Sequence, residues 1–379
     1  MSVGYLDAVL YGLCLHCLRK RSETVVMAKL IGTTLFCLLL IGLPATAVQQ
    51  PRVSAQAHLS TLARIRQNKL LRCGINQETP EYSTSDDHGP RAAFDANFCR
   101  AVAIAILGSG ARVAITVYPD DVAAMQALRK GRVDLLPTLT LDLTHSSSGI
   151  TFSPPVLYDG VGFLAPVTSG ITQPKELSGK KICFLAETEV EVALRLWFGQ
   201  QNSSLQNLRF VPFPFQEEGE MEAAFVTGNC AALAGDRTRL ATTRLAFGTR
   251  AAQFVLLPGQ ISNDPMAAAS RANDPAFAAI VRWTLEILLQ AEAGGVTQQS
   301  IANLSGASDP RVAVLTGRTR EIGWRLGLEN NWAVQVVSSL GNYGEIYDRT
   351  LGLHSPLQLD REQNRLQSQG GLQQTIPLK

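Results

Sequence analysis

The residues best placed to do chemistry lie between Gly131 and Phe163, in the stretch GRVDLLPTLTLDLTHSSSGITFSPPVLYDGVGF. This stretch reads as a strand running into the threonines Thr138 and Thr140, then a loop and a second strand. Hydroxyl side chains can donate and accept hydrogen bonds. The pattern therefore indicates a site for a small ligand at the end of a strand.

Two carboxylates, Glu187 and Glu189, stand at the start of an expected helix. A cleft carboxylate could act as a general acid, but the positive end of a helix stabilises acidic side chains without any catalysis. No nucleophile, metal cluster or phosphate loop accompanies them in the sequence. The sequence therefore favours binding over catalysis.

Short apolar runs alternate with helical segments of 3.6-residue periodicity, which predicts an α/β fold with mostly parallel sheets. The first half is expected to contain strands at Leu70–Ile75, Val113–Val117 and Val133–Leu136. Pro137 should end the third strand. Asp95 should cap one helix, and Asp120 and Asp121 should open another, with Val122 among its inward side chains.

The same alternation begins again in the second half. Strands are expected at Lys181–Leu185, Leu208–Val211, Ala231–Ala234 and Gln253–Leu257. Asp274-Pro275 marks a helix start, because proline suits the first helical position. The last stretch, up to Lys379, is polar and is expected to lie over the surface.

The length and composition limit the class of protein. A chain of 379 residues is too long for one compact core, which predicts two lobes. It is 46% hydrophobic and 17% charged, with a formal net charge of +2. No dense run of Lys and Arg is present, so nucleic acid is not expected as a partner.

The first 47 residues resemble a leader rather than part of the fold. From Met27, a lysine precedes an apolar run and the triplet Ala45-Thr46-Ala47, which is typical of a secretory signal peptide. We expect translation to start at Met27 and cleavage near Ala47, or alternatively after Ala57. A periplasmic protein without a lipid anchor is expected.

Four cysteines follow the leader: Cys73, Cys99, Cys183 and Cys230. An even number in an oxidising compartment predicts two disulfides, for which three pairings exist. We favour Cys73 with Cys99 and Cys183 with Cys230, since each bridge then stays within one lobe. The alternative is four buried free thiols.

Several short segments, in this order, resemble the type II periplasmic solute-binding proteins (family 3), and in particular the general L-amino-acid-binding components of ABC importers. The segments are FDANFCRAVA from Phe94, YDGVGF from Tyr158, RWTL from Arg282, GNYGEIY from Gly341 and GGL from Gly370. The cysteines also fall where this subfamily has its own. The resemblance extends from about Leu62 to the C-terminus.

The resemblance implies an α/β fold of two lobes, joined by two crossing strands near Tyr158–Val167 and Leu256–Arg271, that close over a ligand by a hinge motion. The implied divisions are a leader and signal peptide at 1–47, the first part of lobe one at 60–165, lobe two at 166–258, the return to lobe one with C-terminal helices at 259–345, and a C-terminal extension at 346–379.

The family site also shows where this chain departs from its relatives. Threonines corresponding to Thr138 and Thr140 precede an arginine that grips the ligand carboxylate, but this chain has His145 in the arginine's place. Histidine is mostly neutral at pH 7 and lacks the planar fork of arginine. An alternative is that His145 is a loop residue with no ligand contact.

Lobe two of the family has Gly-Thr-Thr at a helix start, where this chain has Glu187-Thr188-Glu189. Two carboxylates there would repel a ligand carboxylate. Asp236 stands at the position of the acidic residue that binds the ligand amino group, and the alternative is that it only caps a helix. The cleft is therefore expected to be acidic and to tolerate amines or cationic compounds.

Two further positions follow from the resemblance. Tyr82 is the candidate for the aromatic side chain that packs on the ligand, while Phe94 is assigned to the core. Arg91 replaces a tryptophan of close relatives. It could supply a guanidinium to the ligand, or it could be a solvated arginine in a loop.

The implied function is the periplasmic substrate-binding component of an amino-acid ABC importer. It would act as a monomer that delivers an amino acid or amine to an inner-membrane permease, without cofactor or metal. One alternative is a ligand sensor on the same fold that transports nothing. A more remote alternative is a dehydratase-like enzyme that uses Glu187 or Glu189 as an acid.

Overall fold

The structure is a computed structural model that describes residues 59–76, 90–146, 149–200, 209–306, 310–316 and 321–377. The expected leader and Tyr82 lie outside the described residues. In the described ranges, no helix has the length and apolar character needed to cross a membrane.

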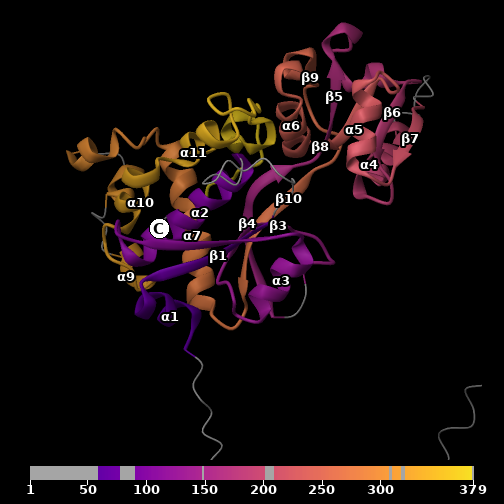
Figure 1. Ribbon diagram of the computed structural model, residues 1–379. Helices are drawn as coiled ribbons and strands as arrows, with labels where there is room; N and C mark the ends of the chain where they lie inside the picture. The colour runs from indigo at the N-terminus through magenta and orange to yellow at the C-terminus, as the bar shows by residue number, and fades with distance from the viewer. Residues whose placement is uncertain are drawn as a thin grey trace, which may run out of the picture. The chain divides into compact units, whose positions relative to one another are not determined.

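The first lobe is built on five strands (Figure 1): β1 (Leu70–Asn76), β2 (Arg112–Tyr118), β3 (Leu136–Thr140), β4 (Ile150–Asp159) and β10 (Asp264–Arg271). β1 and β2 are parallel, whereas β10 lies between β3 and β4 and runs antiparallel to both. A parallel bridge between Cys73 and Leu135 joins the two groups. The α-helices are α1 (Thr61–Asn68), α2 (Pro90–Leu107), α3 (Asp121–Arg129), α7 (Pro275–Ala293), α8 (Pro310–Leu315), α9 (Glu321–Arg325), α10 (Trp332–Leu340) and α11 (Tyr343–Thr350).

The second lobe contains one five-stranded sheet in the order β7-β6-β8-β5-β9. Its strands are β5 (Val161–Pro166), β6 (Lys181–Leu185), β7 (Val211–Phe215), β8 (Ala232–Asp236) and β9 (Phe254–Leu256), and its α-helices are α4 (Glu189–Gln200), α5 (Glu218–Val226) and α6 (Arg237–Ala246). β6 is parallel to β7 and β8, whereas β5 is antiparallel to β8 and β9.

The chain passes between the lobes twice, at Gly160 and again between β9 and β10. The two crossings are bonded together: the Val161 amide donates to Ser262 Oγ at 2.9 Å, and the Ile261 amide donates to the Val161 carbonyl at 2.7 Å. A Cβ atom on Gly160 would collide with the Ser262 carbonyl oxygen. Glycine is therefore required where the crossings approach each other.

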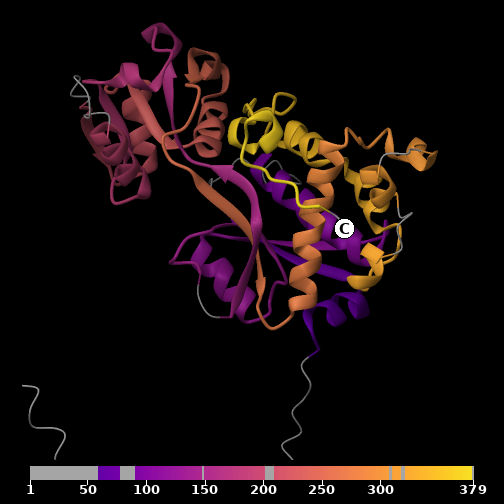
Figure 2. The ribbon, with the colours of Figure 1, turned by 180° about the vertical axis from the view of Figure 1, so that it is seen from behind.

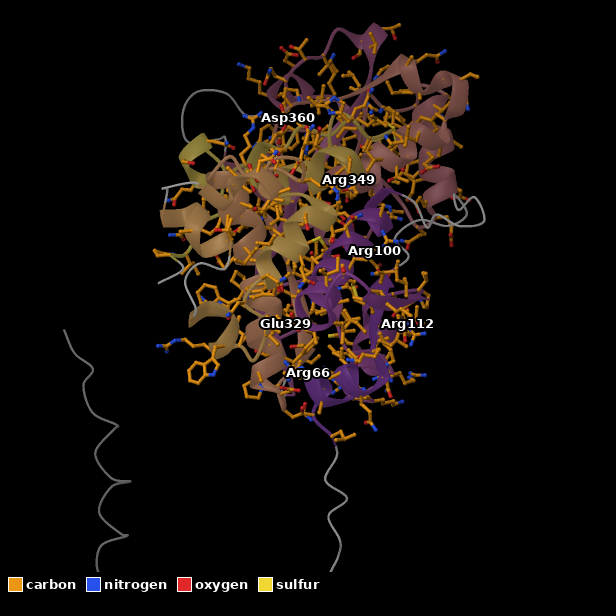
Figure 3. The ribbon with its side chains drawn as sticks, turned by 90° about the vertical axis from the view of Figure 1, so that its left-hand side faces the viewer. Arg66, Arg100, Arg112, Glu329, Arg349 and Asp360 are labelled. Carbon is orange, nitrogen blue, oxygen red and sulfur yellow. A yellow bond between two sulfur atoms is a disulfide. The ribbon has the colours of Figure 1, made fainter. Side chains whose placement is uncertain are left out.

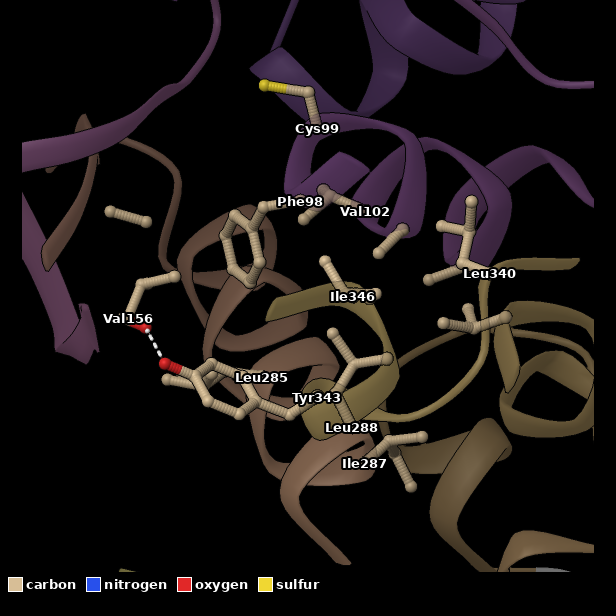
Figure 4. Packing of buried hydrophobic residues seen from close by; sticks show 14 of the residues in the cluster. Phe98, Cys99, Val102, Val156, Leu285, Ile287, Leu288, Leu340, Tyr343 and Ile346 are labelled. Atoms are coloured by element: carbon tan, nitrogen blue, oxygen red, sulfur yellow. Dashed lines mark hydrogen bonds between the residues drawn. The ribbon is translucent and has the colours of Figure 1, made fainter. Parts of the chain in front are cut away.

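The core of the first lobe forms where α2, α7 and α11 meet (Figure 4). Phe98 and Val102 of α2 pack with Leu285 of α7 and Ile346 of α11, and all four are buried. The neighbouring Tyr343 is also buried, and its hydroxyl donates to the Val156 carbonyl at 2.9 Å. The polar tip of this tyrosine thus ties the helical core to β4, the strand that leads into the first crossing.

Two disulfides join Cys73 to Cys99 and Cys183 to Cys230, with Cα atoms 6.4 and 5.8 Å apart. These are the expected pairs. The first bridge links β1 to α2, and the second links β6 to the residues before β8. Each bridge therefore stays within one lobe.

Several sequence expectations were wrong because tertiary contacts override local signals. The sheets are not mostly parallel, since β5 and β10, which border the crossings, pair antiparallel with their neighbours. Asp95 does not cap α2, which begins at Pro90; Asp95 lies inside it and is buried. Val122 of α3 is 59% exposed rather than inward.

Prolines also led to wrong predictions of where two strands begin or end. Pro137 lies within β3, an edge strand, at a shift in its register with β10, where no amide donor is needed. The strand expected at Leu208–Val211 is instead β7, which begins at Val211 and contains Pro212 and Pro214. β7 is likewise an edge strand, where proline is tolerated.

The polar C-terminal stretch does not simply cover the surface. Ile376 bonds to α7 through its carbonyl and its amide, at 2.8 Å from Gln290 and 2.9 Å from Glu286. In Figure 2 this stretch runs beside α7. Leu366 and Gln373 are buried. Polar side chains are buried here because they bond to backbone groups, which composition alone does not reveal.

Candidate functional site

A cavity of about 360 Å³ lies in the second lobe, at the carboxyl ends of the parallel strands β6 and β8. Ligands of open α/β sheets bind at this end of the strands, and small-molecule sites measure about 300 to 1,000 Å³. The cavity is lined by Leu185, Glu187, Thr188, Glu189, Val190, Glu218, Met221, Leu233, Ala234, Gly235, Asp236, Arg239, Leu240 and Thr243.

One wall is the turn between β6 and α4. Glu187 adopts a positive φ of 59°, and its amide lies 3.4 Å from the Glu191 carboxylate. The Thr188 hydroxyl donates to the Leu185 carbonyl at 2.7 Å, which fixes the turn. Glu187 and Glu189 are exposed, so their carboxylates face solvent at the cavity.

Asp236 forms the opposite wall, where β8 ends and α6 begins. It occupies the N-cap position of α6, but its side chain makes no capping hydrogen bond to the helix. Simple capping therefore does not explain this aspartate. The structure gathers four of the residues expected in the site, Glu187, Thr188, Glu189 and Asp236, around one cavity.

Glu218 and Arg239 also line the cavity, although neither was expected in the site from the sequence. Arg239 Nε lies 2.7 Å from Glu218 Oε1 and its Nη2 lies 2.5 Å from Glu218 Oε2, a two-pronged ion pair. Arg239 stands three residues after Asp236, in the first turn of the helix that Asp236 precedes. That spacing was the available signal.

The cavity is dominated by negative charge. Its lining contains four carboxylates and, among the described residues, one guanidinium, which is paired with Glu218. Behind this pair, burial raises the pKa of Glu222, whose carboxylate accepts a hydrogen bond from Thr243 at 3.1 Å. The site therefore suits cationic groups better than anions.

A further carboxylate lies near the second crossing. Burial raises the pKa of Asp264, the first residue of β10, and the charges of Asp159 and Glu189 raise it further. Ser262 opposes this by donating a hydrogen bond to Asp264 at 2.8 Å. The negative field of the cavity residue Glu189 thus extends to the crossing strands.

In the first lobe, the hydroxyl of one of the two expected threonines, Thr138, already bonds to another residue of the protein. Thr138 is buried, and its hydroxyl lies 2.9 and 3.0 Å from the two oxygens of Asp95. Thr140 ends β3, is only half-buried and pairs with Met266 of β10. The Thr138 hydroxyl therefore joins β3 to α2.

His145 is held between two aspartates. Its Nδ1 lies 2.8 Å from Asp142 Oδ2, and its Nε2 lies 3.9 Å from Asp121 Oδ2. Asp121 also accepts a hydrogen bond at 2.7 Å from Asn76, the last residue of β1. Two carboxylates beside this imidazole disfavour an anionic ligand group here.

The side chains of the two remaining candidates, Tyr82 and Arg91, lie outside the described part of the structure. Tyr82 lies outside the described residues. Arg91 falls in the first turn of α2 rather than in a loop, and its side chain is not among those described. In the described part of the chain, no three His, Cys, Asp or Glu side chains gather as a metal site.

The start of α6 is anchored to both crossings. Thr238 donates its hydroxyl to Asp159, the last residue of β4. Arg237 Nη1 donates to the carbonyls of Leu257 and Gly259, each at 2.7 Å. These bonds fix the backbone that follows the cavity residue Asp236 relative to the two crossings.

The C-terminal segment supports the same region. Glu362 lies 3.2 Å from Arg237 and accepts from the Gly259 amide at 2.9 Å. Asn364 brackets the backbone of Tyr158, accepting from its amide and donating to its carbonyl at 2.7 Å each. Both crossings therefore contact this segment.

Comparisons with known proteins extend over both lobes. No protein-family model matches the chain. It is 32% identical over 331 residues to the amino-acid ABC transporter-binding protein YhdW of Escherichia coli O157:H7, covering 86% of this chain and 95% of the relative. The general L-amino acid-binding periplasmic protein AapJ of Rhizobium johnstonii is 32% identical over 345 residues, with 89% and 97% covered. A solved periplasmic binding protein from Brucella ovis with glutathione bound is 33% identical, with a TM-score of 0.69 and 85% and 100% covered.

Proposed function

Because the chain belongs to the amino-acid ABC transporter-binding proteins, we propose that it captures a small amino-acid-like solute in the cavity of its second lobe and delivers it to a membrane permease. It is the substrate-binding component of an importer of this class. The observation that carries the proposal for the site is the convergence of Glu187, Thr188, Glu189 and Asp236 on one cavity.

The ligand specificity has changed from that of a general amino-acid receptor. Four carboxylates line the cavity, and the residue in place of the family arginine, His145, is engaged by Asp142. A carboxylate ligand would meet repulsion at Glu187 and Glu189, whereas an ammonium or guanidinium group would be attracted. We therefore assign the site to a solute with excess positive charge.

The relatives support the wider setting. AapJ is a periplasmic protein, which favours a periplasmic location for this chain, after cleavage of the signal peptide that begins at Met27. The relatives are binding proteins rather than enzymes, which supports binding without catalysis. A monomer that works with an inner-membrane permease completes the proposal.

A thermal-shift screen of the mature protein tests the ligand class. The probes are neutral, acidic and cationic L-amino acids together with diamines, and each hit is followed by isothermal titration. A ligand that binds only the folded state stabilises it by about 2.7 kcal/mol at 100 times its Kd. We expect cationic probes to give the largest rise in Tm.

A double substitution, Glu187→Gln with Glu189→Gln, should weaken the cationic hits. The matched control is Glu220→Gln, which removes an exposed glutamate of α5 that does not line the cavity. Micromolar binding of several neutral L-amino acids, without preference for cations, would contradict the proposed specificity. Loss of probe uptake on deletion of the gene, measured in cells, tests the transport role separately.

A further inference from the structure

We propose that Arg239 is the residue that binds the carboxylate of the ligand, and that Glu218 competes with the ligand for it. This inference rests on the proposed function. It deepens that function by assigning a ligand that carries one carboxylate together with excess positive charge, as a cationic amino acid does.

The position of Arg239 supports this role. Arg239 lines the same cavity as Asp236 and stands three residues after it, in the first turn of α6, which Asp236 precedes as the N-cap. Asp236 would take the ligand amino group while Arg239 takes its carboxylate. The two charges of an amino acid are close together, as are these two side chains along the helix.

The Glu218 pair shows that the guanidinium fork is already oriented for a carboxylate. Its Nε and Nη2 atoms bind the two oxygens of Glu218 side by side, at 2.7 and 2.5 Å. A ligand carboxylate would need the same two-pronged geometry. Glu218 therefore occupies the position that we assign to the ligand carboxylate.

Exchange of the two carboxylates is feasible because the pair is not deeply buried. The side chains of Arg239 and Glu218 are 31% and 25% exposed. Partly exposed ion pairs are weak, so a ligand can displace Glu218 at small cost.

Pairs of probes that differ only by a carboxylate test the inference: L-lysine with cadaverine, and L-arginine with agmatine. Isothermal titration measures the affinity ratio within each pair for wild type, Arg239→Gln, Arg239→Lys and Glu218→Gln. In wild type we expect the amino acid to bind more tightly than its decarboxylated partner.

Arg239→Gln should lower amino-acid affinity by about 10- to 100-fold, the effect of losing hydrogen bonds to a charged group, and change amine affinity by less than about 3-fold. The amino-acid affinity of Arg239→Lys should lie between those of wild type and Arg239→Gln, because lysine keeps the charge but lacks the planar guanidinium fork. Glu218→Gln should tighten amino-acid binding about 2- to 5-fold by removing the competitor.

The matched control is Arg195→Gln. Arg195 also pairs with a glutamate, Glu191 at 2.6 Å, but it is 60% exposed and does not line the cavity. It should leave both affinities unchanged, and the Tm of every variant reports whether it is folded.

Several outcomes would overturn the inference. One is that Arg239→Gln weakens the binding of the amino acid and of its amine equally, and another is that it changes neither affinity. A third is that wild type binds the amine as tightly as the amino acid. If wild type binds neither cationic pair but binds neutral amino acids, and Arg239→Gln abolishes that binding, the proposed charge preference is wrong while the role of Arg239 stands. If wild type binds no probe, both the proposed charge preference and the role of Arg239 are wrong.

Discussion

Substitution of Asp134 by asparagine should strongly destabilise the first lobe. The Asp134 side chain is completely buried and contacts Arg64, Arg72 at 2.8 Å and Arg271 at 3.9 Å. It also accepts from the Arg72 amide at 3.0 Å. Asparagine would keep the shape of the side chain, but it would remove the one negative charge that these contacts share.

The magnitude follows from burial. Breaking a buried ion pair by removing one partner costs about 3 to 5 kcal/mol, because the remaining charge is left without compensation. The arginine side chains are 24%, 31% and 12% exposed, so water recovers part of that loss. Repulsion remains, since burial and the charges of Arg72 and Arg271 already lower the pKa of Arg64 to about 10. We therefore expect the lower limit, about 3 kcal/mol.

Thermal unfolding followed by circular dichroism measures the effect. At about 2.1 cal/mol/K of unfolding entropy per residue, a loss of about 3 kcal/mol corresponds to a fall in Tm of roughly 4 °C in a chain of 379 residues. Asp360→Asn is the control, because Asp360 pairs with Arg365 at the surface, where the two side chains are 54% and 46% exposed (Figure 3). A Tm for Asp134→Asn equal to that of the control would refute the reasoning.

Three further predictions concern stability. Burial raises the pKa of Glu222, so this group stabilises the fold below its ordinary pKa of 4.5, and that contribution is lost as the pH rises through the raised value. Glu222→Gln should therefore raise Tm at pH 7, with a gain that shrinks toward pH 4.5; an equal gain at both pH values would contradict this. Asn364→Leu should cost about 2 to 4 kcal/mol and accelerate hydrogen exchange at the Tyr158 amide, because the amide and the carbonyl of Tyr158 both lose their hydrogen-bond partner. An unchanged exchange rate would show that Asn364 does not hold these two backbone groups. Replacing Cys183 and Cys230 by serine should cost about 4 kcal/mol for a separation of 47 residues, measured by urea unfolding, and a loss below about 1 kcal/mol would show that the bridge constrains little.

The sequence predicted the parts of the fold that depend on local pattern. Strands β1 and β6 and the start of α7 at Asp274-Pro275 lie where apolar runs and helix signals predict them. The family resemblance is confirmed, as is the two-lobed α/β class. These features depend on periodicity and order, which the sequence records directly.

The predictions from the sequence were wrong where contacts between residues far apart in the chain decide the structure. Asp95 looks like a helix cap, but its partner is Thr138, which is 43 residues away. Arg239 and Glu218 are 21 residues apart and meet only because α5 and α6 begin at the same cavity. The C-terminal Asn364 looks like a surface residue until β4 supplies the backbone groups that it binds. Which ligand the expected site residues bind remains a prediction.

The two disulfides have a consequence for how the molecule matures. Cys73 pairs with Cys99 at a separation of 26, and Cys183 with Cys230 at a separation of 47, so each cysteine pairs with its neighbour among the four. The loops follow one another and are not nested. In a chain that enters an oxidising compartment from its amino end, the first loop can close before Cys183 arrives. Oxidation in order of emergence therefore gives the native pairing directly, without reshuffling of bonds.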